Sequence, residues 1–106
     1  MTKHFQISLS SAVILGSILC STSVQAQDGQ LRTELMASFC FSCHGQGGKG
    51  ALKMPPLNEL KPSDIKESMI GFKSGEERST VMEGIAKDFS KDDIILLADY
   101  FAALPD

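Results

Sequence analysis

The sequence predicts an all-α protein with about three main helices. In three segments, apolar residues recur every three to four positions, which is the spacing that keeps side chains on one face of a helix. No stretch shows the convincing apolar–polar alternation of a half-buried strand. A segment rich in glycine and proline separates the first two helices and cannot itself be helical.

The N-terminus has the features of a secretory signal peptide. A short basic start precedes a mostly apolar stretch at residues 5–19, and residues 24–26 offer a small-x-Ala cleavage site. The apolar stretch is too short for a membrane span. We therefore predict a signal peptide at 1–26 and a single domain at 27–106. The mature protein would lie in the periplasm without a stable membrane span.

The first predicted helix runs from about Gln30 into a cysteine motif. Its apolar residues fall at i, i+4, i+5 and i+8, which places them on one face of the helix. These residues are Leu31, Leu35, Met36 and Phe39.

The motif itself is Cys40-Phe41-Ser42-Cys43-His44, a C-x-x-C-H pattern that is typical of covalent c-type haem attachment. The two thiols add across the haem vinyl groups, and the two-residue spacer lets both cysteines straddle one edge of the porphyrin. His44 follows the second thioether directly and would supply one axial nitrogen to the iron. The pattern predicts one covalently attached haem c.

Two other interpretations of the motif are weaker. A structural zinc site normally needs four Cys or His ligands, and the mature chain offers only Cys40, Cys43 and His44. A thioredoxin-like redox dithiol would follow a strand and open a helix, and nothing upstream of Cys40 alternates like a strand. Haem attachment is therefore favoured over both.

The segment from Gly45 to Asn58 holds four glycines and the pair Pro55-Pro56. It could be a plain surface loop, but its glycines allow the backbone to approach a flat cofactor closely. An axial histidine also needs its second ring nitrogen held, usually by a backbone carbonyl. We expect the Pro55 carbonyl to hold His44 in this way.

The second predicted helix starts after Pro62, where Ser63 can cap its amino end, and it stops at Gly75. Its apolar face comprises Ile65, Met69 and Phe72. The third predicted helix is the clearest, because Ser90-Lys91-Asp92-Asp93 resembles a capping box with Asp in place of the preferred Glu or Gln. Its stripe is Ile94, Leu97, Ala98, Phe101 and Leu104, and Pro105 follows.

The choice of sixth iron ligand decides between electron transfer and other haem chemistry. Met36 lies one turn before Cys40 and belongs to the His44 side, and Met69 fits an ordinary core position. Met82 lies in a non-periodic stretch, far enough along the chain to reach the other haem face. A thioether suits haem iron and raises its reduction potential. We favour Met82, with Met69 and Met54 as the alternatives.

Composition sets further limits. Of ten basic and 13 acidic side chains, removal of Lys3 leaves nine and 13, a formal charge of −4. Basic runs are absent, which argues against nucleic-acid binding. A mature chain of 80 residues can barely build a hydrophobic core. A buried porphyrin would supply the missing apolar mass, and we expect the apolar faces of the chain to cover the haem.

The order of C-x-x-C-H, glycine loop, Pro-x-Leu, helix, Arg, Met and carboxy-terminal helix resembles a class I cytochrome c over nearly all of the mature chain. A narrower resemblance is to the cytochrome subunit of flavocytochrome c sulfide dehydrogenase. The segments that carry it are Phe72–Arg78, Thr80–Met82, Ile85–Ser90 and Leu97–Ala102. Some members of that group carry two haem domains, whereas this chain has one C-x-x-C-H.

The resemblance implies a small class I cytochrome c fold wrapped around one covalent haem. It also implies that Met82 is the axial ligand, that Pro55 supports His44 and that Arg78 lies near a haem propionate. With His44 and Met82 both bound, the iron has no open position for substrate. The chain would then transfer electrons and would not be an enzyme by itself.

Three functions are consistent with this sequence. The favoured one is an electron-transfer subunit that accepts electrons from an FAD-containing flavoprotein oxidising sulfide or a related sulfur compound. The alternative is a freestanding, diffusible carrier that exchanges electrons with a terminal oxidase, a reductase or other periplasmic carriers. A haem sensor would require an open distal position.

Overall fold

The computed structural model describes residues 21–105, and within them it contains helices, turns and loops but no strand. Its elements are α1 Ser21–His44, the short 3-10 helix η1 Gln46–Gly48, α2 Pro62–Ser74, α3 Met82–Lys87 and α4 Lys91–Ala102. The all-α class predicted from the sequence is therefore confirmed.

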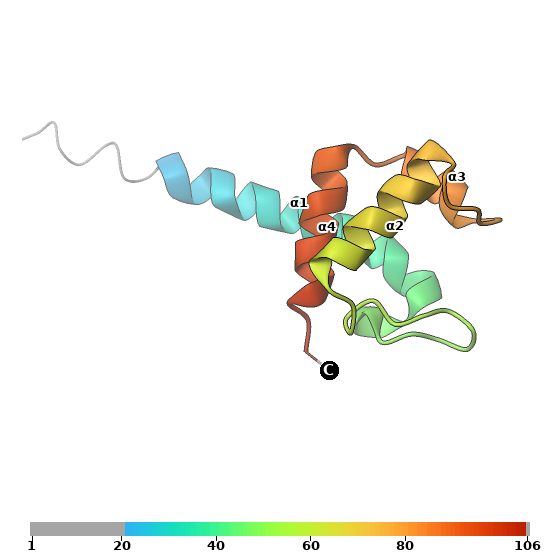
Figure 1. Cartoon of the computed structure of the whole chain (residues 1–106). Coiled ribbons are helices and arrows are strands. Elements are labelled where there is room, and N and C mark those ends of the chain that lie inside the picture. The colour runs from blue at the N-terminus through green and yellow to red at the C-terminus, as the bar shows by residue number, and fades with distance from the viewer. Residues whose placement is uncertain (1–20, 106) are drawn as a thin grey trace, which may run out of the picture.

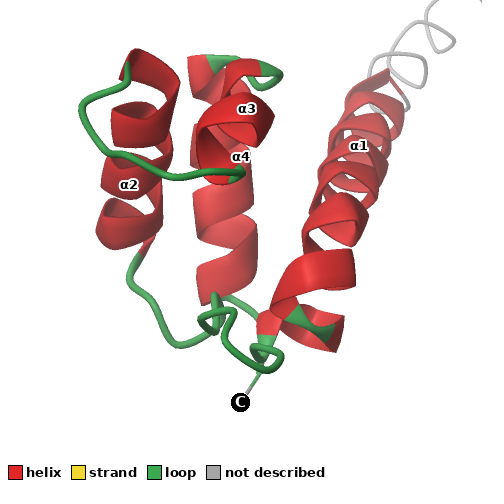
Figure 2. Ribbon diagram, turned by 90° about the vertical axis from the view of Figure 1, so that its right-hand side faces the viewer, coloured by secondary structure: helices red, strands yellow, loops and turns green. Residues whose placement is uncertain are grey.

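The helix α4 is the central element of the molecule. It packs against both α1 and α2, and α3 packs against α2. Figure 2 shows α4 between α2 and α1, and Figure 1 shows the amino-terminal part of α1 running away from the other helices. The carboxy-terminal half of α1, which carries the cysteine motif, is thus the part that joins the helical body.

The hydrophobic core lies where α1, α2 and α4 meet. Phe101 is its centre, with ring centroids 5.9 Å from Phe41 and 5.6 Å from Tyr100 in edge-on arrangements that aromatic pairs prefer. The buried members of the cluster are Ala37, Ile65, Leu97, Ala98 and Phe101. Two of the five are alanines, so few large side chains are buried in this cluster.

Most of the apolar residues named for the first helix lie outside the protein core. Leu31 and Leu35 are more than half exposed and Phe39 is 75% exposed, whereas Ala37 is buried. Of the four predicted residues, Met36 packs against the core. Apolar side chains occur on several sides of α1, so their spacing cannot choose the buried face. The side of Ala37 faces α4 because a methyl group allows the two helices to approach closely.

The helix α2 matches its predicted stop but not its predicted cap. Gly75 ends it with a left-handed φ of 82°, a conformation that glycine adopts at little cost. The residue before the helix is Lys61, which makes no side-chain cap. Ser63 lies inside the first turn and its hydroxyl donates to Asp64 Oδ1 at 3.1 Å. Pro62 at the first helical position explains this shift, since its missing N–H needs no cap.

The structure also contains helical turns that the sequence pattern did not predict. The short helix α3 begins at Met82, in the stretch that was expected to be irregular, so the described residues form four α-helices rather than about three. Within the glycine-rich segment, η1 forms a single 3-10 turn in which Gly47 has a φ of 69°. Both elements are too short to show a clear apolar period.

The helix α4 follows its prediction closely. The capping box is present: the Ser90 hydroxyl accepts from the Asp93 N–H at 3.1 Å, and Asp93 Oδ2 accepts from the Ser90 N–H at 3.1 Å. Ile94, Leu97 and Phe101 are buried. Arg32 adds a link to α1, with its Nη2 2.8 Å from Asp93 Oδ1. Asp93 therefore both caps α4 and joins it to α1.

The Asp93 carboxylate gives a testable pH dependence. Hydrogen bonds from the Ser90 side chain, then from its backbone, and the charge of Arg32 lower the pKa of this carboxyl. A carboxyl whose pKa is lower in the folded chain than in the unfolded chain stabilises the fold at pH values above the unfolded pKa of about 3.9. This stabilisation is lost as the pH falls below that value, through the lower pKa of the folded state. We expect Asp93→Asn to cost about 1–2 kcal/mol of unfolding free energy at neutral pH.

The measurement is denaturant unfolding near pH 7 and near pH 3, on either side of that ordinary value. The difference between Asp93→Asn and the wild type should shrink in acid. The control is Asp92→Asn, because Asp92 lies in the same first turn but is exposed. An equal loss at both pH values would contradict a stabilising charge at Asp93.

The predicted signal peptide, residues 1–26, lies mostly outside the described residues and stays a prediction. Where the description begins, α1 already starts at Ser21 rather than near Gln30, so the helix passes through the predicted cleavage point without a break. Among residues 21–105, the structure has no helix that is long and apolar enough to cross a membrane.

Candidate haem site

The C-x-x-C-H residues lie in the last turns of α1. The Cys40 side chain is partly buried, and its Sγ donates weakly to the Met36 carbonyl at 3.8 Å. Cys43 is exposed, and both thiols are free. His44 ends the helix and is buried, with 9% of its surface exposed. One helical end thus presents two thiols and an imidazole.

The ring of His44 is held by the glycine-rich segment. Its Nδ1 lies 2.8 Å from the Pro55 carbonyl oxygen, and the Gly50 N–H donates to the His44 carbonyl at 2.7 Å. A hydrogen bond from Nδ1 to this carbonyl fixes the tautomer in which Nε2 carries the free lone pair. The structure therefore brings His44 and Pro55 together and leaves Nε2 for a ligand.

The glycine-rich segment packs against the hydrophobic core next to the candidate site. Gly48 has a φ of 71°, and a Cβ built there would lie 3.0 Å from the Phe101 ring. Its carbonyl accepts the Leu57 N–H at 2.6 Å. A side chain at position 48 would push the segment away from α4. Glycine here lets the loop return to His44.

A hollow of about 640 Å³ opens beside the motif. Its walls come from the end of α1 and from the segment after η1; the lining residues are Ser42, Cys43, Ala51, Leu52, Lys53 and Met54. The lining is mainly apolar and includes Cys43 of the motif, whereas Cys40 and His44 are not among the lining residues. An apolar hollow beside Cys43 fits a flat apolar group attached through sulfur.

The environment of the Cys40 thiol differs from that of a reactive cysteine. Burial raises the pKa of the Cys40 thiol, and the nearby Cys43 raises it further, although a backbone hydrogen bond acts in the opposite direction. A redox-active or catalytic cysteine instead needs a lowered pKa, because the thiolate is the reactive form. The electrostatics of Cys40 thus argue against the thioredoxin-like interpretation.

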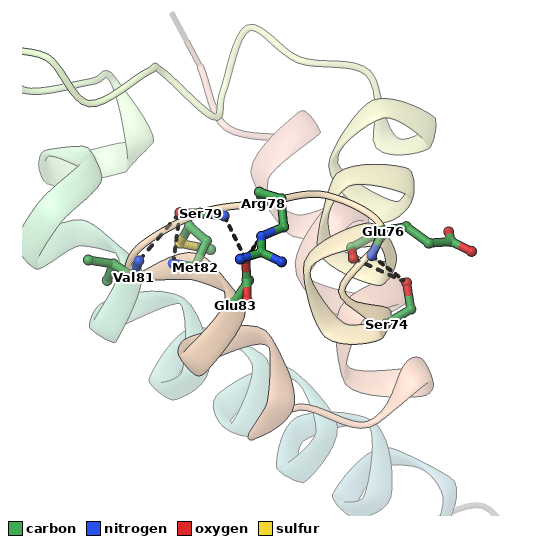
Figure 3. Close-up of polar contacts among 8 residues, drawn as sticks. Ser74, Glu76, Arg78, Ser79, Val81, Met82 and Glu83 are labelled. Carbon is green, nitrogen blue, oxygen red and sulfur yellow. Dashed lines mark hydrogen bonds and ion pairs between the residues drawn. The ribbon is translucent and has the colours of Figure 1, made fainter.

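Met82 and Arg78 lie together on a different element, the connection from α2 to α3. The Ser79 hydroxyl accepts from the Met82 N–H at 3.1 Å, and Glu83 Oε1 accepts from the Ser79 N–H at 2.9 Å (Figure 3). This reciprocal pair resembles a capping box and fixes the backbone of Met82 at the first residue of α3. The Met82 side chain is partly buried.

Arg78 pairs with an acidic neighbour. Its Nε lies 3.4 Å from Glu83 Oε1, and 88% of its side chain is exposed. No hydrogen bond or ion pair within the described residues joins Arg78 or Met82 to His44. The propionate role of Arg78 and the ligand role of Met82 stay predictions. Of the alternative ligands, Met69 packs against the core and Met54 is exposed beside the hollow.

Sequence reasoning missed two features of the site. The first is the pair Ser79 and Glu83, because a capping box places Glu or Gln three residues after the serine, whereas Glu83 is four residues on and lies inside α3. The second is the Gly50 bond to His44, which joins residues through a folded loop and has no local signature.

No protein-family model matches the chain. Among curated proteins, the cytochrome subunit of sulfide dehydrogenase from Chlorobaculum tepidum is 36% identical over 73 residues, covering 69% of this chain and 66% of that protein. Cytochrome c-553 from Desulfomicrobium norvegicum is 33% identical, covering 68% of this chain and 94% of the relative. Cytochrome c-553 from Helicobacter pylori strain 26695 is 32% identical, covering 85% and 92%.

The helical fold and these relatives define a small haem protein of the electron-transfer class. More narrowly, the chain belongs to the c-type cytochromes, and it binds haem c covalently. The predicted resemblance to the cytochrome subunit of sulfide dehydrogenase is confirmed. Like these relatives, the chain is an electron carrier or subunit rather than a catalytic enzyme by itself.

Proposed function

We propose that this chain is a periplasmic cytochrome that accepts electrons from a flavoprotein oxidising sulfide or a related sulfur compound. In this proposal Cys40 and Cys43 form the thioethers, and His44 and Met82 are the axial ligands. The observation that carries it is the 2.8 Å contact between His44 Nδ1 and the Pro55 carbonyl, which leaves Nε2 free beside two thiols on one helical end.

The residues of the chain have distinct tasks in this function. When bound, haem supplies a centre that exchanges one electron at a time. His44 is oriented by Pro55, and its Nε2 would be the nitrogen that binds the iron. Met82 is fixed at the start of α3 by Ser79, and its thioether would close the opposite position to substrates. Arg78 would lie near a propionate.

The proposed partner is supported by the name of a relative, and the proposed compartment by the N-terminal sequence. The relative with 36% identity is named as a subunit of sulfide dehydrogenase, and this chain spans 66% of its length. The sequence pattern at 1–26 supports export to the periplasm. A flavin gives up electrons singly, and a one-electron haem centre is a suitable acceptor for them. An FAD-containing subunit is thus the proposed donor.

A freestanding carrier is the second candidate. It is supported by the share of each relative's length that this chain spans. The chain spans 94% and 92% of two cytochromes c-553 but only 66% of the sulfide dehydrogenase subunit. A diffusible carrier would pass electrons to a terminal oxidase, a reductase or another carrier without a permanent flavoprotein partner.

The deciding experiment is purification of the cytochrome from its native periplasm, followed by stopped-flow reduction with sulfide. If the cytochrome is a subunit, a flavin-containing chain should co-purify with it. Sulfide should then reduce the haem rapidly in the sample that contains this flavoprotein and slowly in the isolated cytochrome. If reduction by sulfide were equally slow or equally fast in both samples, the subunit function would be wrong and the diffusible carrier would stand.

A further inference from the structure

The helix α3, which begins at Met82, has little to hold it in place by itself. It ends at Lys87 and has six residues, of which Ala86 is buried. A helix of this length is not stable in isolation, because its few hydrogen bonds do not offset the ordering of its backbone. Its position therefore depends on α2, the helix that it packs against (Figure 1).

Lys73 of α2 holds the carboxy-terminal end of α3. Its Nζ donates to the carbonyl oxygen of Lys87 at 3.0 Å. Lys87 is the last residue of α3, and the carbonyls of a last turn have no partner within their own helix. A positive charge at this end also interacts favourably with the partial negative charge of those carbonyls. Lys73 thus supplies a partner that α3 cannot supply itself.

Gly71 of α2 holds the connection that leads to Met82. The Gly71 carbonyl accepts from the Glu77 N–H at 3.0 Å, and the Ser68 hydroxyl donates to Glu77 Oε1 at 3.4 Å. Gly71 is buried, and a Cβ built there would lie 2.9 Å from Glu77 Cγ and 3.3 Å from Glu77 Cβ. Glycine at this position therefore lets the connection lie directly on α2.

The two contacts enclose the segment that carries Met82. Glu77 precedes Met82 in the chain and Lys87 follows it, and both are tied to α2. Neither Gly71 nor Lys73 lines the hollow beside the cysteine motif. A functional side chain keeps its geometry when the groups behind it fix its backbone. These contacts can therefore set the place of Met82 without taking part in the haem site.

We propose that Gly71 and Lys73 are positioning residues for the Met82 ligand: they hold both sides of its segment on α2 and so keep its thioether at the iron. This inference rests on the proposed ligand role of Met82. An iron-bound thioether competes with any added ligand, so the fraction of protein with the thioether released sets the apparent affinity for that ligand. Weakening either contact should raise this fraction while Met82 is still present.

The first test is Lys73→Met, which removes the ammonium group and keeps most of the apolar stem. The ferric holoprotein should bind imidazole about threefold more tightly, because one hydrogen bond at the protein surface changes an equilibrium by about that factor. Lys73→Arg keeps a donor and should bind imidazole nearly as weakly as the wild type. The control is Lys66→Met, which changes an exposed lysine of the same helix and should leave the affinity unchanged.

The second test is Gly71→Leu. Leucine favours helices, so α2 should persist, but the new side chain would take the space of the Glu77 stem and displace the connection. The affinity for imidazole should rise about tenfold. On heating, the sulfur–iron band should be lost before the helical circular dichroism signal. Gly29→Leu is the control, because a Cβ at this helical glycine would meet no atom of the described residues within 4 Å.

A double-mutant cycle separates positioning from general stability. In a Met82→Ala background, Lys73→Met and Gly71→Leu should have no further effect on imidazole affinity, since no thioether is left to displace. Effects of the same size in that background would overturn the inference, as would an unchanged affinity in both single variants. If Met82→Ala itself left the band and the affinity unchanged, the proposed ligand would be wrong, and the positioning role would be lost with it.

Discussion

Replacing Cys43 with serine is expected to remove most of the holoprotein and to leave the remaining chain largely unfolded. The change deletes one of the two proposed thioethers while keeping the size of the side chain. Cys43 is exposed, so the substitution itself disturbs no packing. Cys40→Ser should have the same outcome, although Cys40 is partly buried and its loss also affects the core cluster.

The reason for the unfolding is the size of the core. The cluster where α1, α2 and α4 meet has five buried members, and two of them are alanines. Domains of about 70–80 residues rarely gain more than 3–5 kcal/mol from such a core alone. A haem bound at the hollow would add a large apolar surface to this small core. Without it, the free energy of unfolding should fall to near zero.

The test combines haem-stained yield with far-ultraviolet circular dichroism of the purified chain. The control is Ser42→Ala, which changes the residue between the cysteines and removes only an exposed hydroxyl bonded to the Phe39 carbonyl. That variant should give normal holoprotein. A Cys43→Ser chain that is helical and melts cooperatively without haem would contradict this account of the core.

Much of the fold could be predicted where its determinants are local. The capping box of Ser90 and Asp93, the stripe of α4 and the left-handed Gly75 all depend on a few neighbouring residues. The motif at Cys40–His44 is equally local. These are the parts of the sequence where one short pattern has one structural meaning.

The remaining features depend on residues far apart in the chain. The buried face of α1 is set by its fit against α4, and the apolar residues of the helix gave no clear choice. The positive φ of Leu52 lies in a turn that is flanked by two hydrogen bonds to His44, from the Gly50 N–H and to the Pro55 carbonyl. The link from Arg32 to Asp93 joins α1 to α4 across 61 positions. No local sequence pattern predicts any of these three features.

Changing Met82 to alanine is expected to open the distal side of the proposed haem site without unfolding the protein. Alanine favours helices, and the backbone N–H at this position would still donate to the Ser79 hydroxyl, so the start of α3 should persist. The motif cysteines and His44 lie on another element and would still hold the cofactor. The variant separates loss of a ligand from loss of the fold.

Three measurements should change together in the Met82→Ala holoprotein. The weak absorbance band that reports sulfur–iron ligation in the ferric state should vanish, ferrous protein should bind carbon monoxide, and the reduction potential should fall. Met69→Ala is the control, because Met69 packs against the core. That variant should keep the band and lose about 2 kcal/mol of unfolding free energy. If Met69→Ala lost the band while Met82→Ala kept it, the thioether ligand would come from α2 rather than from the start of α3.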